Sequence, residues 1–166
     1  FVWVSHDLET VVWSGRLGAG MGSGVVYVDG SYLAAWVRPI EPDDGGWGSG
    51  EWCVARFDEA GRLEGAPLCY PPAWGFTVDS GGRSARIAAG AGGLALVART
   101  DRGNIVFQRA DLLGHPVGDA IVLGEPDRFT LGAMGLAWDG SSFALLYARR
   151  RFPDTYQLVF QRFAPS

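Results

Sequence analysis

Short apolar segments separated by glycine-rich turns run along the whole chain, and none shows the 3.6-residue apolar period of an amphipathic helix. The clearest segments recur at a fixed spacing. They centre on Cys53, Val106 and Val159, and 106 − 53 = 53 while 159 − 106 = 53. A constant period in this range is typical of repeat architectures. The pattern therefore predicts an all-β chain made of a repeated group of short strands.

The middle repeat predicts four consecutive antiparallel strands, which we call A, B, C and D. They cover residues 84–89, 94–99, 105–110 and 120–123, with turns rich in glycine and aspartate between them. Four antiparallel strands in chain order are the unit of a β-propeller blade. The fold class expected is thus a β-propeller-type array of four-stranded antiparallel blades.

The other repeats fill the chain as a single domain, residues 1–166. Residues 25–70 predict a blade, 84–123 a second blade, and 134–164 the A, B and C strands of a third. Residues 1–14 predict a C–D hairpin, because Val12 precedes Val26 by 26 − 12 = 14 residues, as Val122 precedes Leu136 (136 − 122 = 14). Closed propellers need about four to eight blades. The ring in this chain is therefore expected to be incomplete, and completed by a second copy or another protein chain.

Several short motifs resemble secreted bacterial β-propeller repeat proteins with blades of about 50 residues. In such a blade an apolar strand is followed by an Asp-Gly turn, an aliphatic strand, a Phe-Gln-Arg segment and a Gly-Pro-x-Gly hairpin. The resemblance implies an extracytoplasmic binding or scaffold module, and it carries over no functional residue. The matching segments are residues 137–140, 143–147, 160–162 and 114–118.

The two cysteines occupy opposed positions in one predicted hairpin. The C–D hairpin of the first blade centres on Gly61, since (53 + 69)/2 = 61, so Cys53 and Cys69 face each other across adjacent strands. Directly opposed Cβ atoms lie near disulfide reach. The expectation is a structural disulfide formed in an oxidising compartment; the alternative is a pair of buried free thiols.

Composition argues against two kinds of interaction, nucleic-acid binding and membrane insertion. The formal net charge is −4 and the pI about 5.1, so the basic excess of a nucleic-acid-binding protein is missing. No run of 18 apolar residues occurs, and no membrane span is expected. The cysteine pair and the resemblance to secreted propellers favour an extracytoplasmic location: secreted, periplasmic or on the cell surface.

Loop length indicates where recognition would occur. The B–C and D–A connections are long and carry aromatic and charged residues, whereas the A–B turns are minimal. Long loops on a rigid scaffold are where binding function concentrates. The candidate ligand- or partner-binding residues on these loops are Asp43, Asp44, Trp47, Trp74, Phe76, Arg128, Arg150 and Phe152.

Two ligand classes fit these loops, and each has a plainer alternative. Carboxylates from Glu41 to Glu51 could hold Ca²⁺, the one cofactor candidate, or form a solvated acidic loop. Trp47 and Trp74 could stack on a carbohydrate, or pack on their own loops.

No catalytic constellation is apparent. The chain has no Gly-x-Ser-x-Gly nucleophile elbow, and neighbouring Asp43 and Asp44 do not make a facing carboxylate pair. The function expected is a non-catalytic binding or structural subunit. The alternative is a propeller segment of a secreted carbohydrate-active or other hydrolytic enzyme whose catalytic groups lie outside this chain.

Overall fold

The described part of the chain is all-β and antiparallel, as predicted. It contains thirteen strands and no helix. The computed structural model describes residues 2–4, 11–14, 21–39, 50–70, 86–90, 92–99, 104–123, 130–151 and 155–164.

The first four-stranded sheet has the order β3-β4-β5-β6, which is also the order along the chain. Its strands are Met21–Val28, Ser31–Pro39, Gly50–Phe57 and Leu68–Tyr70. Before it, β1 (Val2–Val4) pairs with β2 (Val11–Ser14) as a separate hairpin.

The middle sheet repeats this plan with β7 to β10. Its last strand begins at Pro116, earlier than the sequence predicts, because a bulge between Val117 and Ile121 lets pairing with β9 continue past the turn. The Gln108 amide nitrogen donates to the carbonyl oxygens of Val117 and Gly118 and so holds this bulge. The strands are Arg86–Gly90, Gly93–Arg99, Ile105–Asp111 and Pro116–Leu123.

The last sheet has three strands, β11 (Thr130–Trp138), β12 (Phe143–Arg151) and β13 (Thr155–Phe163). The sequence predicts Arg150 on a long loop, and this prediction is wrong, because residues 149–151 belong to β12. The three arginines continue β12, because each still pairs with a residue of β13 and so keeps its backbone in the ladder. No fourth strand pairs with β13 among the described residues.

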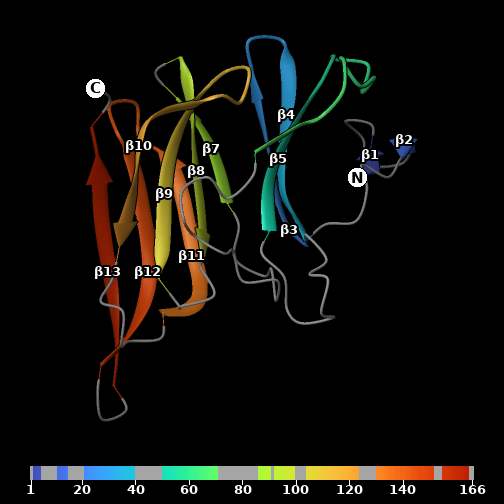
Figure 1. Cartoon of the computed structure of the whole chain (residues 1–166). Coiled ribbons are helices and arrows are strands. Elements are labelled where there is room, and N and C mark those ends of the chain that lie inside the picture. The colour runs from blue at the N-terminus through green and yellow to red at the C-terminus, as the bar shows by residue number, and fades with distance from the viewer. Residues whose placement is uncertain are drawn as a thin grey trace.

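The three sheets stack face to face (Figure 1) and do not close into a ring. One apolar cluster joins the first and middle sheets, with Leu33 and Val54 against Leu94 and Leu96. A second joins the middle and last sheets, with Phe107 against Leu145. Neighbouring sheets come closest at their first strands, where β3 contacts β7 and β7 contacts β11.

Each sheet uses its two faces in the same way. We call the face that packs on the following sheet the forward face, and the one that packs on the preceding sheet the backward face. Val54 and Phe107 lie on forward faces of the first and middle sheets, and Leu96 and Leu145 on backward faces of the middle and last sheets. Side chains alternate between the two faces along the regularly paired parts of each strand, so each sheet can pack on both of its neighbours.

An arginine at the same repeat position of strand C hydrogen-bonds to the A–B turn in the first and last sheets. Arg56 donates to the Ser31 hydroxyl, and Arg162, 162 − 56 = 106 residues later, donates to Ser142 and to the Asp139 carboxylate. Backbone N–H groups of Ser141 and Ser142 donate to Asp139 and hold its pKa well below the usual range. The equivalent arginine–serine contacts tie the A–B turn to strand C in both the first and the last sheet, although the turn spans residues 29–30 in the first and 139–142 in the last.

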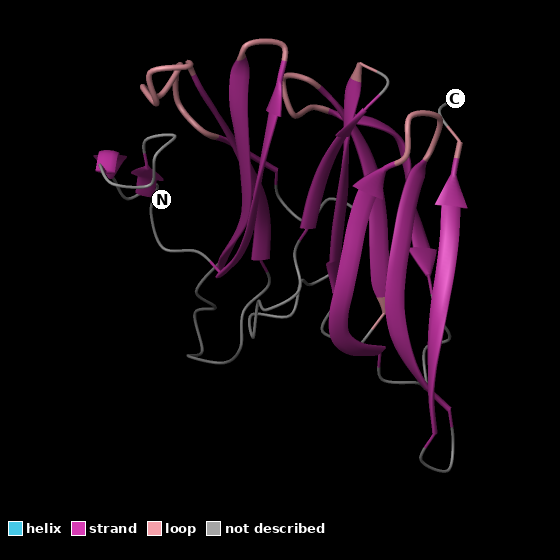
Figure 2. Cartoon of the chain, turned by 180° about the vertical axis from the view of Figure 1, so that it is seen from behind, coloured by secondary structure: helices cyan, strands magenta, loops and turns pink. Residues whose placement is uncertain are grey.

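Chain order divides the connections between the two ends of the stack. The A–B and C–D turns lie at one end, the hairpin end, where the described turns gather in pink in Figure 2. The B–C and D–A connections leave from the other end, the loop end. They include residues 40–49, 71–85 and 124–129.

Candidate functional site

Most of the predicted binding residues lie outside the described residues. Only Arg150 falls within a described strand, where its backbone pairs with Tyr156. The loop-end site therefore stays a prediction. The residues outside the described part are Asp43, Asp44, Trp47, Trp74, Phe76, Arg128 and Phe152.

The predicted disulfide is confirmed. Cys53 on β5 and Cys69 on β6 are direct register partners, their Cα atoms are 4.1 Å apart, and their sulfurs are bonded. The middle sheet has Val106 and Val122 opposed in the same way. An apolar cross-strand pair has thus been replaced by a covalent one that closes the C–D hairpin of the first sheet.

Among the described residues, one cluster has the side-chain types of a metal site, and it contains the same two cysteines. Glu51, Cys53 and Cys69 bring their ligand atoms within 4.8 Å of one another. Both sulfurs are used by the disulfide, so neither offers a thiolate, and Glu51 is ion-paired with Arg38. The cluster is therefore structural.

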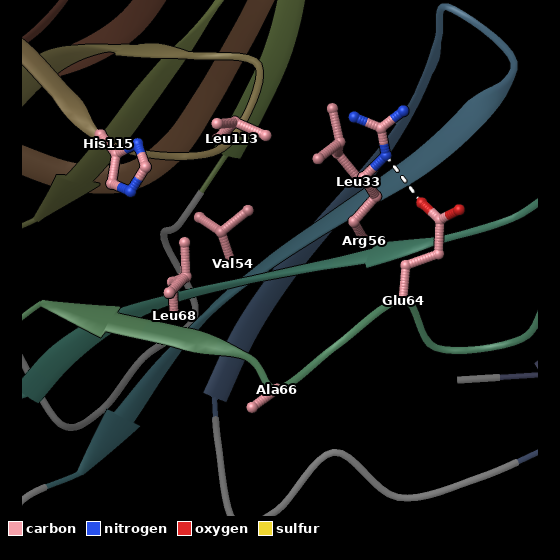
Figure 3. A pocket seen from close by; sticks show the side chains of 8 residues that line it. All are labelled: Leu33, Val54, Arg56, Glu64, Ala66, Leu68, Leu113 and His115. Atoms are coloured by element: carbon pink, nitrogen blue, oxygen red, sulfur yellow. Dashed lines mark hydrogen bonds and ion pairs between the residues drawn. The ribbon is translucent and has the colours of Figure 1, made fainter.

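A groove opens at the hairpin end, between the β5–β6 hairpin of the first sheet and the β9–β10 hairpin of the middle sheet (Figure 3). It holds about 170 Å³. Leu33, on β4, and Val54, on β5, contribute buried apolar lining. The remaining lining residues are Arg56, Glu64, Ala66, Leu68, Leu113 and His115.

Each charged group on the groove wall already has a partner. The Arg56 guanidinium donates to a Glu64 carboxylate oxygen at 2.7 Å. The His115 Nδ1 lies 3.0 Å from the Asp111 carboxylate. The groove therefore offers apolar surface beside polar groups that are already hydrogen-bonded, which suits an apolar group better than an ion.

The Asp111 carboxylate also shapes the β9–β10 turn. Burial alone would raise its pKa, but N–H groups of His115 and Leu113 and the His115 ring together lower it below the usual range. Asp111 is thus a charged cap that fixes the backbone carrying His115.

Tyr70, the last residue of β6, lies beside His115. Its ring meets His115 edge-on, with centroids 6.3 Å apart, and its hydroxyl is buried without a hydrogen-bond partner. Burial first, and then the nearby Asp111 charge, raise the pKa of Tyr70. The neutral phenol therefore persists well into alkaline solution and acts as packing.

The sequence missed this groove because its two walls come from different repeats. The nearest signal was the Gly114-His115-Pro116 turn, which we noted as a structural motif. Gly114 has φ +90°, and a Cβ there would lie 3.0 Å from the Val54 side chain. A glycine thus lets one hairpin approach the neighbouring sheet.

We expect Gly114→Ala to destabilise the fold by about 2 kcal/mol, because the left-handed backbone and the contact with Val54 both oppose a methyl group. Gly118→Ala is the matched control: it also has positive φ but nothing within 4 Å of its added Cβ, so about 1 kcal/mol is expected. Urea titration measures both variants. Equal losses would contradict a packing role for Gly114.

Comparison with known proteins identifies no family. The sequence matches no protein-family model, and no curated protein matches it significantly. Within the described residues, no helix has the length and apolar character needed to cross a bilayer. The functional argument therefore rests on the chain's own geometry.

Proposed function

We propose that this chain is a β-propeller module of an extracytoplasmic protein, acting as a non-catalytic binding or structural subunit that recognises its ligand with the loop end. One observation carries the proposal. Three up-and-down sheets repeat the same forward-to-backward packing and meet at their first strands. Sheets that converge on one strand and spread outward are the arrangement expected around a propeller axis.

Two further observations support the details. The Cys53–Cys69 disulfide favours an oxidising compartment, since cytosolic thiols are kept reduced. Residues 40–49 and 71–85 are the long connections between strands, and both leave from the loop end. Rigid sheets with long connections at one end are a common way to present a recognition surface.

Carbohydrate is the ligand class we propose to test, because Trp47 and Trp74 belong to these connections and indole rings stack on sugar faces. On a glycan array, we expect binding that falls at least about tenfold in Trp47→Ala or Trp74→Ala, the loss of one aromatic hot spot. Leu63→Ala, exposed in the β5–β6 hairpin, is the control from the hairpin end and should bind normally.

Two results would contradict this assignment. Binding to no glycan would remove carbohydrate as the ligand. An equal loss in Leu63→Ala would remove the loop end as the recognition surface.

A further inference from the structure

The forward face of the last sheet is exposed, although its repeat equivalents are buried. Positions 54, 107 and 160 are 53 residues apart (107 − 54 = 53 and 160 − 107 = 53). Val54 is 3% exposed and Phe107 1%, whereas Phe160 is 62% exposed. The same holds two residues earlier, where Trp52 and Ile105 are buried and Leu158 is 72% exposed.

This face carries an apolar patch over β12 and β13. Leu146 on β12 pairs with Phe160 on β13, and Ala148 pairs with Leu158. Arg162, at the margin, is already bound to Asp139 at 2.6 Å. Arg150, which pairs with Tyr156, takes the next place along this face. The apolar part is therefore formed by Leu146, Leu158 and Phe160, and an exposed apolar patch of this kind marks an interaction surface.

The complementary surface lies at the other end of the same chain. Val25, Ile87 and Leu136 occupy equivalent places on strand A, since their partners on strand B are Ala34, Leu96 and Leu145. Ile87 is 7% exposed, but Val25 is 53% and the neighbouring Tyr27 54% exposed. The backward face of the first sheet is thus uncovered along β3, while its β4 and β5 positions, including Trp36 and Cys53, are buried.

We propose that a second copy of this chain docks head to tail, so that the forward face of each last sheet packs against the β3 side of the other chain's first sheet. The contact repeats the approach of strand A to strand A that joins the sheets within one chain, where β3 contacts β7 and β7 contacts β11. It uses the β3 side only, because Ala34 and Trp36 on β4 are already buried. Two copies bring 2 × 3 = 6 stacked sheets, within the range of closed propellers. The inference rests on the propeller arrangement proposed above and names the partner that completes it.

The proposed two-copy ring would also cover the unpaired edge of β13. An unpaired edge strand is a template for pairing with another chain. The β1–β2 hairpin precedes the first sheet by the spacing that separates a D strand from the next A strand. In the head-to-tail pair, the free edge of the β1–β2 hairpin of one copy is available to cover β13 of the other.

The test is sedimentation velocity of the whole chain over a wide concentration range. We expect a species with the mass of two copies, and no growth beyond it, because a closed ring leaves no free face. Phe160→Glu and Val25→Glu should each raise the dimer dissociation constant by about 30-fold or more. Ile121→Glu, at a 44% exposed position on β10 of the middle sheet and outside the two proposed docking surfaces, should leave the dissociation constant unchanged.

Mixing the variants gives the sharpest result. A Phe160→Glu chain and a Val25→Glu chain share one altered interface and keep one intact interface, so the mixture should recover the two-copy mass. Circular dichroism and a thiol assay verify that each variant keeps its sheets and its disulfide. Leu158→Asn, a milder change on the same face, should weaken the pair in the same direction.

Three outcomes would overturn the proposal. They are a wild-type chain that stays monomeric, a mass that grows without limit, and a Val25→Glu chain that dimerises normally while Phe160→Glu does not, which would indicate a two-fold contact between forward faces. A monomeric chain that still loses glycan binding in Trp47→Ala would remove the second copy and leave the proposed function standing.

Discussion

Truncating Phe107 should remove about 3–5 kcal/mol of the free energy of unfolding, the range expected for a buried phenylalanine replaced by alanine. Phe107 is 1% exposed between the middle and last sheets. Its ring stacks on Phe163 with centroids 3.9 Å apart and meets Phe143 at 6.3 Å. Alanine would leave a cavity that two sheets held by their own ladders cannot close. Because small domains are stable by only about 5–15 kcal/mol, Phe107→Ala should unfold at a clearly lower urea concentration than the wild type.

Phe160→Ala is the matched control for this prediction. It makes the same chemical change at the repeat-equivalent position, but on the exposed face of the last sheet. Urea titration followed by circular dichroism, at a concentration where the chain is monomeric, should show a loss below about 1 kcal/mol. Comparable losses in the two variants would mean that the middle and last sheets are not packed as described.

Reducing the Cys53–Cys69 disulfide should lower the free energy of unfolding by about 3 kcal/mol in the chain-entropy model, since the bond closes a short loop in the unfolded chain. The measurement is the urea midpoint with and without dithiothreitol.

The double variant Cys53→Val/Cys69→Val is the control, because the middle sheet carries Val106 and Val122 at the same opposed positions. It keeps an apolar cross-strand pair, and its midpoint should not respond to dithiothreitol. A wild-type midpoint that ignores the reductant, or two titratable thiols in denatured unreduced protein, would contradict the prediction.

The sequence by itself determined the strands, their order and the disulfide. Strand alternation and turn glycines act locally, so the 53-residue period placed β5, β9 and β13 correctly. The register of one hairpin then put Cys53 opposite Cys69, because both lie a similar number of residues from Gly61. The strand ends were not determined by the sequence: Arg149 to Arg151 have the polarity of a loop, but their backbone pairs with β13 and extends β12.

Only the tertiary structure decided which faces are covered. Phe107 and Phe160 occupy the same place in the repeat, and nothing local distinguishes them; one lies under a neighbouring sheet and the other is exposed. The groove at His115 likewise needs two hairpins from different repeats, brought together because Gly114 lacks a side chain. Whether a strand face is buried depends on whether another sheet packs on it, at a distance of about 10 Å. A strand's own sequence does not show whether that neighbouring sheet is present.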